Sequence, residues 1–429
     1  MKACAVILVL AVLSTSAVGQ TPGQSTHVAP TRTEMRITAA NEAIRKDPER
    51  YQAYDDLAYS LVKRSEETSD RADLEKAEAA LAKSFAVAPK NFQGEKTHVF
   101  VLLEEHEYSQ ALDEAKTLSH ETPDDVLLWG YLAEAESALG DYNDAEKAAQ
   151  WMINLRPGNV PGLLQGAELR TVWGDTDGAL EFLSQGLQAT PEFETGDAAS
   201  ILTKMANVQL ATGQIEAAEK LDEEALKAFP DYYSALESLE RVRIAQGRCA
   251  AAVELLEKRT AGSPRPERLY ALAEALERAG RTDEARRVYS EFESHARDEI
   301  SHAYNANRQL VFYYTDHATK PVEALRIATL EAAQRHDVYT LDAYAWALYA
   351  NQDYAGARAQ MDRVLAGGVR DAAIFFHAAA IAEQLNDRAA ATRYLEGSLK
   401  LNPFSESAEA ARKALAKLAP ASATSRKPE

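Results

Sequence analysis

The sequence predicts an all-α solenoid, a superhelix of about ten helix-turn-helix repeats. The main observation is a series of prolines spaced 34 residues apart: Pro89, Pro123, Pro157 and Pro191, and then Pro230 and Pro264. A fixed interval of this length is the signature of a repeat architecture. Proline and glycine are otherwise sparse, at 15 and 20 of 429 residues, and the alternating β-branched pattern of strands is missing.

The clearest repeat runs from Val126 to Pro157. The repeat has a large residue at Trp129, a leucine followed by a small residue at Leu132-Ala133, and a turn at Gly140-Asp141-Tyr142. Its second helix contains Ala145 and Met152, and the repeat ends at Pro157. This order of residue types resembles the tetratricopeptide repeat (TPR) family. The resemblance implies two helices per repeat and a concave surface lined chiefly by the first helix of each pair.

A small residue opens the second helix of every predicted repeat. These alanines are Ala77, Ala111, Ala145, Ala179, Ala218, Ala252, Ala285, Ala324, Ala357 and Ala391. A small side chain here lets two helices approach closely, while bulky neighbours fill the remaining space. Turn glycines that begin with Gly140 and end with Gly280 are expected to close first helices in the left-handed conformation. Each pair hides only part of its apolar surface, so neighbouring repeats must stack.

The repeat register divides the array in two. Repeats 1 to 7 are expected over residues 49–292, and repeats 8 to 10 over residues 293–403. The division falls in the stretch from Arg281 to Lys320, which contains neither glycine nor proline. This stretch predicts unusually long helices, at which the solenoid bends or changes its partner face.

The ends of the chain differ from the repeats. Residues 33–48 and 404–418 are predicted as capping helices, because each combines a repeat-like apolar pattern with polar residues that can shield the end of the stack. Residues 20–32 and 419–429 are rich in Thr, Ser, Pro, Gly and Ala. We expect these two segments to be disordered.

The first residues predict export. Residues 1–19 combine a basic start, an apolar run from Ala5 to Leu13 and a small-x-small pattern at Ala17-Val18-Gly19, as a cleaved signal peptide does. The alternatives are secretion from the cell and an uncleaved membrane anchor, although nine apolar residues are short for a bilayer. We expect a periplasmic protein without a membrane-spanning segment once the signal is removed.

Charge and cysteine content exclude some functions. The formal net charge of −19 disfavours binding to nucleic acid, because phosphate backbones would be repelled. After signal cleavage Cys249 is the only cysteine, so packing and not a disulfide must stabilise the fold.

The sequence contains no recognisable catalytic motif. Phosphate-binding glycine loops, HExxH, CxxC, nucleophile elbows and EF-hand loops are all missing from the chain. We therefore expect no enzyme activity, no cofactor and no metal. The sharpest alternative is a metal-dependent enzyme that uses His295, Glu299 and His302, whose i, i+4, i+7 spacing would place them on one face of a helix.

The resemblance to TPR proteins implies a partner-binding groove. Its register places aromatic and polar side chains of the first helices on the concave surface, with a concentration of rings in the last three repeats. The predicted partner-binding residues are Tyr313, Tyr339, Asp342, Trp346, Tyr349, Phe376, Phe100 and Tyr59. Aromatic side chains are typical of binding hot spots, although each ring could instead pack against a neighbouring helix.

These observations favour a non-catalytic scaffold or adaptor outside the cytoplasm that binds a protein or peptide in its concave groove. A chaperone-like handler of unfolded envelope or secreted proteins is the main alternative, because an acidic surface keeps such complexes soluble. The oligomeric state stays open.

Overall fold

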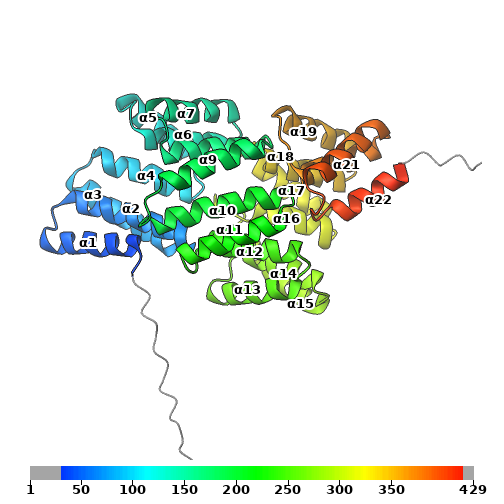
Figure 1. Ribbon diagram of the computed structural model, residues 1–429, viewed down its shortest axis with the longest axis horizontal. Coiled ribbons are helices and arrows are strands. Elements are labelled where there is room, and N and C mark those ends of the chain that lie inside the picture. Colours follow the sequence, from blue (N-terminus) through cyan, green and yellow to red (C-terminus); the bar gives the residue numbers. More distant parts are fainter. Residues whose placement is uncertain (1–29, 419–429) are drawn as a thin grey trace, which may run out of the picture.

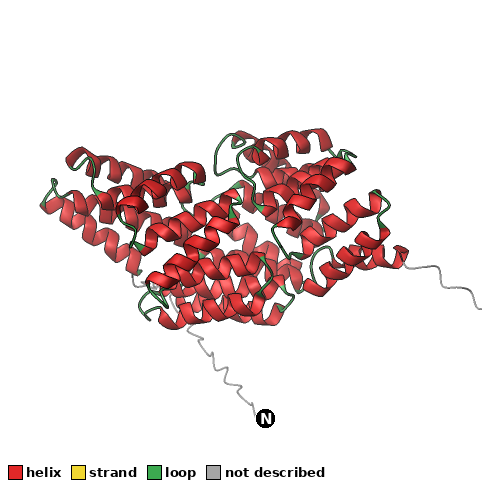
Figure 2. Cartoon of the chain, turned by 90° about the horizontal axis from the view of Figure 1, so that it is seen from above, coloured by secondary structure: helices red, strands yellow, loops and turns green. Residues whose placement is uncertain are grey.

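The computed structural model describes residues 30–418, and within them the chain is entirely helical (Figures 1 and 2). The helices are α1 (Arg32–Lys46), α2 (Tyr51–Thr68), α3 (Ala72–Val87), α4 (Phe92–Glu104), α5 (Tyr108–Glu121), α6 (Val126–Leu139), α7 (Tyr142–Leu155), α8 (Val160–Val172), α9 (Thr176–Ala189), α10 (Thr195–Ala211), α11 (Ile215–Ala228), α12 (Tyr233–Ala245), α13 (Cys249–Gly262), α14 (Pro266–Arg278), α15 (Thr282–Asp298), α16 (Asn307–Phe312), the π-helical turn η1 (Tyr313–His317), α17 (Pro321–Ala332), α18 (Val338–Ala350), α19 (Tyr354–Ala366), α20 (Ala372–Gln384), α21 (Arg388–Leu401) and α22 (Ala408–Leu418). The predicted signal peptide (1–19), most of the predicted linker (20–32) and the tail (419–429) lie outside the described residues. No described helix is both long enough and apolar enough to span a membrane.

The observed helix pairs follow the predicted register. All ten alanines at the start of the second helices are at most 2% exposed, because each lies where two helices meet most closely. Aspartate or asparagine begins many of the first helices, and its side chain accepts hydrogen bonds from the exposed backbone N–H groups there, as at Asn91, Asp125 and Asn159. The chain is an all-α solenoid of the TPR type.

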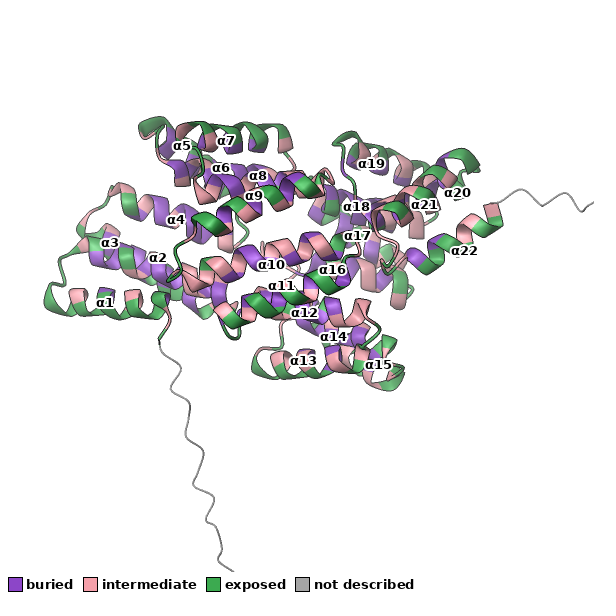
Figure 3. Cartoon of the chain, viewed as in Figure 1, coloured by how far each residue is buried: buried purple, intermediate pink, exposed green. Residues whose placement is uncertain are grey.

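The solenoid begins with the single helix α1, which packs against α2. Thr31 forms a capping box with Glu34, in which each side chain bonds the backbone N–H of the other residue. Inner helices such as α6 and α18 are mostly buried, whereas α1 and the outer helix α7 expose most of their surface (Figure 3). The apolar core therefore follows the layer between first and second helices.

The prediction of unusually long helices between Arg281 and Lys320 is wrong. Helix α15 ends at Asp298, a loop follows, and α16 has only six residues before η1. Two side-chain amides stabilise the loop: Asn305 Nδ2 donates to the carbonyl oxygen of His302, and Asn307 Nδ2 donates to that of Ile300. Such bonds compete with helical ones, which explains why a stretch without glycine or proline still leaves the helix.

The superhelix closes on itself, because the turn after a first helix contacts the start of a first helix further along the chain. The backbone N–H of His336 donates to the carbonyl oxygen of Leu139 at 3.2 Å, and that of Arg370 donates to Val172 at 3.0 Å. Asn402 Nδ2 donates to the carbonyl oxygen of Leu210 at 3.1 Å. These contacts join α6 to α18, α8 to α20 and α10 to the segment between α21 and α22, a regular interval of six helix pairs. We call this line of contacts the inter-turn seam.

Side chains reinforce the inter-turn seam. The hydroxyl of Tyr142 accepts a hydrogen bond from the backbone N–H of Val338, and the indole of Trp173 donates to the carbonyl oxygen of Gly367. In Figure 1, α10, α11 and α12 lie between the N-terminal helices and the C-terminal helices α16 to α22. The two turns of the superhelix are therefore joined directly.

Candidate functional site

The second half of the superhelix surrounds a half-open cavity of about 740 Å³, which we call the C-terminal chamber. Its wall is built by α10, α12, α14, α16, η1, α18 and α20 together with residues 402–407. The aromatic wall residues are Tyr270, Phe312, Trp346, Phe376 and Phe404, and the charged ones are Arg241, Glu274, Arg278, Asp316, Asp371, His377 and Glu406. This volume lies within the roughly 300–1,000 Å³ that is usual for ligand sites.

Trp346 is held rigidly at the chamber wall. Its indole ring stacks between Tyr349, at 4.6 Å between ring centroids, and His377, at 4.2 Å. The indole Nε1–H donates to Asp316 Oδ1 at 2.8 Å, which ties α18 to η1. Since both ring faces are covered, Trp346 presents its edge to the cavity.

His377 lies beside this stack and pairs with a buried carboxylate. Its Nδ1 lies 2.9 Å from Asp342 Oδ1, and the two side chains are only 12% and 7% exposed. Burial acts to lower the pKa of His377, but the nearby Asp342 outweighs burial and raises the pKa above its ordinary value. The imidazole is therefore stabilised in its charged form and neutralised by Asp342.

A short strap closes one side of the chamber. Residues 402–407 connect α21 to α22 and reach back to the turn after α10 through Asn402. On the same strap, Glu406 pairs with Arg278 of α14 at 2.8 Å. The strap therefore joins both ends of the arc of first helices that surrounds the cavity.

The predicted partner-binding residues fall into three groups. Trp346 and Phe376 line the C-terminal chamber, while Tyr349 and Asp342 lie behind its wall and support Trp346 and His377. Tyr313 packs against Tyr289 and Phe292 between α15 and η1. The other three lie elsewhere: Tyr339 on the inter-turn seam, and Phe100 and Tyr59 in the N-terminal half.

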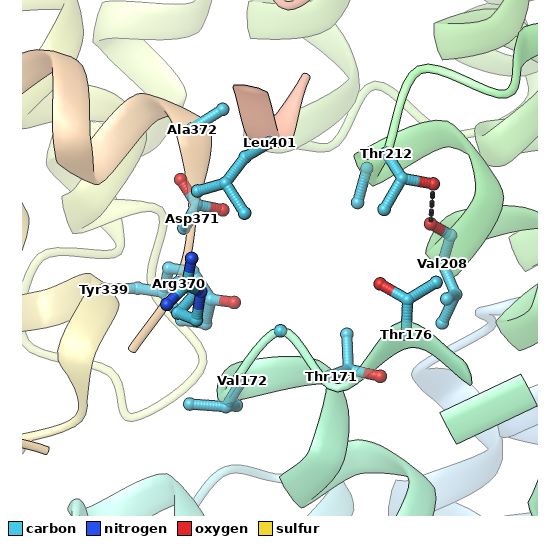
Figure 4. Close-up of a pocket in the computed structure, with 12 residues that line it drawn as sticks. Thr171, Val172, Thr176, Val208, Thr212, Tyr339, Arg370, Asp371, Ala372 and Leu401 are labelled. Carbon is cyan, nitrogen blue, oxygen red and sulfur yellow. Dashed lines mark hydrogen bonds between the residues drawn. The ribbon is translucent and has the colours of Figure 1, made fainter. Parts of the chain in front are cut away.

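Tyr339 borders a small crevice of about 80 Å³ in the inter-turn seam (Figure 4). Thr171, Val172 and Thr176 face it from one turn of the superhelix, and Arg370 and Asp371 face it from the next. The crevice is far smaller than the chamber. It is a joint between turns that has no room for a folded or extended chain.

In the N-terminal half, Phe100 stacks on Tyr131 at 5.5 Å and contacts Tyr59 at 5.7 Å. Charged groups lie nearby, and Lys63 of α2 bridges to Asp197 of α10 at 3.4 Å. Burial, with the neighbouring charges of Glu168 and Glu66, raises the pKa of Glu134 to about 8. This charged interior depends on α2 and α10 meeting, and no local sequence signal indicates it.

The proposed metal ligands do not share a helix face. Since α15 ends at Asp298, only His295 lies within it, whereas Glu299 is the residue after the last helical turn and His302 lies in the loop. The metal hypothesis assumed that these three residues lie on one face of a helix, and this assumption is wrong. Across residues 30–418, no three His, Cys, Asp or Glu side chains come together in an arrangement that could hold a metal ion.

No protein-family model and no curated protein matches the chain. Among solved structures, TTC0263, a thermophilic TPR protein of Thermus thermophilus, is 19% identical over 40% of this chain and 92% of its own, with a TM-score of 0.36. PilW, a type IV pilus biogenesis factor, is 16% identical over 47% and 92%, with a TM-score of 0.41. Human IFIT1, solved as a dimer with m7Gppp-AAAA, is 13% identical over 86% of both chains, with a TM-score of 0.49. The assignment of the fold rests on the repeat geometry of the chain itself.

Proposed function

We propose that this TPR-type α-solenoid is a non-catalytic scaffold that binds a segment of another polypeptide in its C-terminal chamber. The observation that supports the proposal is the convergence of aromatic side chains from α14, α16, α18 and α20 on one cavity of about 740 Å³. Aromatic groups in a desolvated cavity supply much of the energy of polypeptide recognition.

Trp346 and Phe376 contact the bound segment directly in this proposal. Tyr349 and Asp342 act indirectly, because Tyr349 stacks on Trp346 and Asp342 fixes His377. Tyr313 packs between α15 and η1 and Tyr339 lies on the inter-turn seam, so neither contacts the segment in this proposal. The stack of Tyr59, Phe100 and Tyr131 offers a second contact region in the N-terminal half.

The double substitution Trp346→Ala and Phe376→Ala is expected to weaken chamber-dependent peptide binding strongly. We would select binders to the purified protein from a library of randomised 11-residue peptides and measure each affinity by calorimetry. Loss of two buried aromatic contacts should weaken binding by about a hundredfold, from roughly 1–2 kcal/mol for each ring. Circular dichroism would check that the helical content is unchanged.

The matched control is Trp151→Ala with Phe193→Ala, which removes the same side chains from exposed positions, 43% and 60% accessible. This control variant should bind the selected peptides as the wild type does. If no selected peptide distinguishes the chamber variant from the control, binding in the chamber is refuted. Capture of unrelated unfolded proteins with equal affinity would instead favour the chaperone-like alternative.

We also propose that the protein acts outside the cytoplasm, most simply in a periplasm. The support is the sequence pattern of residues 1–19. The protein purified from its native cells is expected to begin at Gln20, as measured by N-terminal sequencing. A protein that begins at Met1 and fractionates with the cytoplasm would contradict this localisation.

A further inference from the structure

Several charged groups of the C-terminal chamber already have a partner within the protein. Arg278 pairs with Glu406, and His377 pairs with Asp342. The carboxylate of Asp371 accepts hydrogen bonds from the backbone N–H groups of Ala373 and Ile374 at the start of α20. Arg278, Glu406 and His377 therefore need no ligand to balance their charges, and the charge of Asp371 is stabilised by the N-terminus of α20.

Two carboxylates of the chamber lack such a partner. Neither Glu274 of α14 nor Asp316 of η1 forms an ion pair with any residue between 30 and 418. Asp316 accepts the indole N–H of Trp346, which orients its carboxylate, and its nearest cationic influence is His377, whose pKa the charge of Asp316 helps to raise. The two groups lie near each other, since the charge of Asp316 helps to raise the pKa of Glu274.

The surroundings of Glu274 make a negative charge there unfavourable without a further cation. Burial, followed by the charge of Glu406, raises the pKa of Glu274 to about 7, and the charge of Arg278 offsets this only in part. A positively charged group that entered the chamber would relieve both effects. The part of the wall at α12 is different, because Arg241 donates to the neutral side chain of Asn207, at 3.2 Å to Oδ1, and has no ion pair among residues 30–418.

Apolar rings stand beside the two carboxylates. Tyr270 lies one helical turn before Glu274 on α14, and Phe312 lies one turn before Asp316 at the end of α16. Lysine and arginine side chains place long methylene stems against apolar surfaces while their charged ends reach polar partners. This part of the chamber offers both environments together.

We propose that the chamber selects its polypeptide through one lysine or arginine side chain, whose charged end lies between Glu274 and Asp316 and whose stem packs on Tyr270 and Phe312. Trp346 acts as a positioning residue for Asp316. The inference rests on the proposed function, because it names the feature of the bound segment that the chamber recognises.

The peptides selected by their dependence on Trp346 and Phe376 test this inference. They are expected to share one lysine or arginine at a fixed position. Replacing that residue with norleucine, which keeps the stem and removes the charge, should weaken binding about tenfold, as expected for one buried charge pair. A glutamate at the same position should abolish binding.

The carboxylates are tested by Glu274→Gln with Asp316→Asn. This variant should bind the lysine and norleucine peptides with equal affinity, within about twofold, and should still bind the norleucine peptide as the wild type does. The matched control is Glu254→Gln with Asp124→Asn, which makes the same change at two exposed positions and should keep the tenfold preference.

Two results would overturn the inference and leave the proposed function standing. One is a set of chamber-dependent peptides without a shared cationic residue. The other is a preference for lysine over norleucine that survives in the Glu274→Gln, Asp316→Asn variant. The absence of any chamber-dependent peptide would be a different result, because it refutes the proposed function itself.

Discussion

Replacing Gly140 with alanine is expected to destabilise the protein strongly and to open the inter-turn seam. Gly140 ends α6 with φ +92°, and a Cβ atom there would lie 2.5 Å from the carbonyl carbon and oxygen of His336. Backbone atoms cannot move aside as a flexible side chain can. The expected loss in the free energy of unfolding is about 3 kcal/mol or more, measured by urea denaturation.

Gly247→Ala is the matched control for this prediction. Gly247 occupies the same turn position after α12, with φ +71°, but no atom lies within 4 Å of its Cβ position. This variant should lose only the left-handed backbone preference of glycine, about 1–2 kcal/mol. Small-angle scattering should show a larger radius of gyration for Gly140→Ala alone, and equal stability and size of both variants would contradict a closing role for the seam.

Asp222→Asn is expected to stabilise the protein at high pH and to leave it unchanged at low pH. Asp222 of α11 is fully buried, and burial raises its pKa from 3.8 to about 7, an effect that the Ser238 hydroxyl and the Arg241 charge only partly offset. Because the folded state holds this proton more tightly than the unfolded state, stability falls as the pH rises from about 4 to 7. A shift of about three units corresponds to ~4 kcal/mol, so we expect a gain of about 2–4 kcal/mol at pH 8.

The measurement is urea denaturation of wild type and Asp222→Asn at pH 4 and pH 8. The difference between them should be absent near pH 4, where the aspartate is protonated in the folded state, should grow as the pH rises to 7, and should be complete above pH 7. Asp124→Asn, at an exposed position, controls for the change in net charge and should behave as the wild type does. A stabilisation of equal size at both pH values would show that the Asp222 charge is not its cause.

The repeat register could be predicted from the sequence because its causes are local. An alanine such as Ala145 must be small wherever two adjacent helices meet, and a glycine such as Gly140 is needed wherever a first helix ends in the left-handed conformation. Both requirements recur within one repeat. The same locality explains why the register alone predicts that Trp346 and Phe376 face inward, as they do in the chamber.

The closure of the superhelix could not be predicted from such local requirements. Closure depends on the small rotation from each helix pair to the next, summed over six pairs, and no single residue determines that rotation. The predicted site therefore omitted Asp316 and the strap at Asn402 as chamber components. The prediction of unusually long helices between Arg281 and Lys320 failed for another reason. Asn305 and Asn307 stabilise the loop by bonds to backbone carbonyl groups, which a pattern of side chains does not reveal.

The interval of six helix pairs also restricts how the length of this protein can change. An open solenoid can gain or lose a repeat by duplication or deletion, because each repeat contacts only its neighbours. Here, one additional repeat between α6 and α18 would place Leu139 and Gly140 opposite a different helix start, and the same displacement would affect Val172 and Leu210. Natural variation in repeat number should therefore be confined to the two ends, outside the pairs that the inter-turn seam joins.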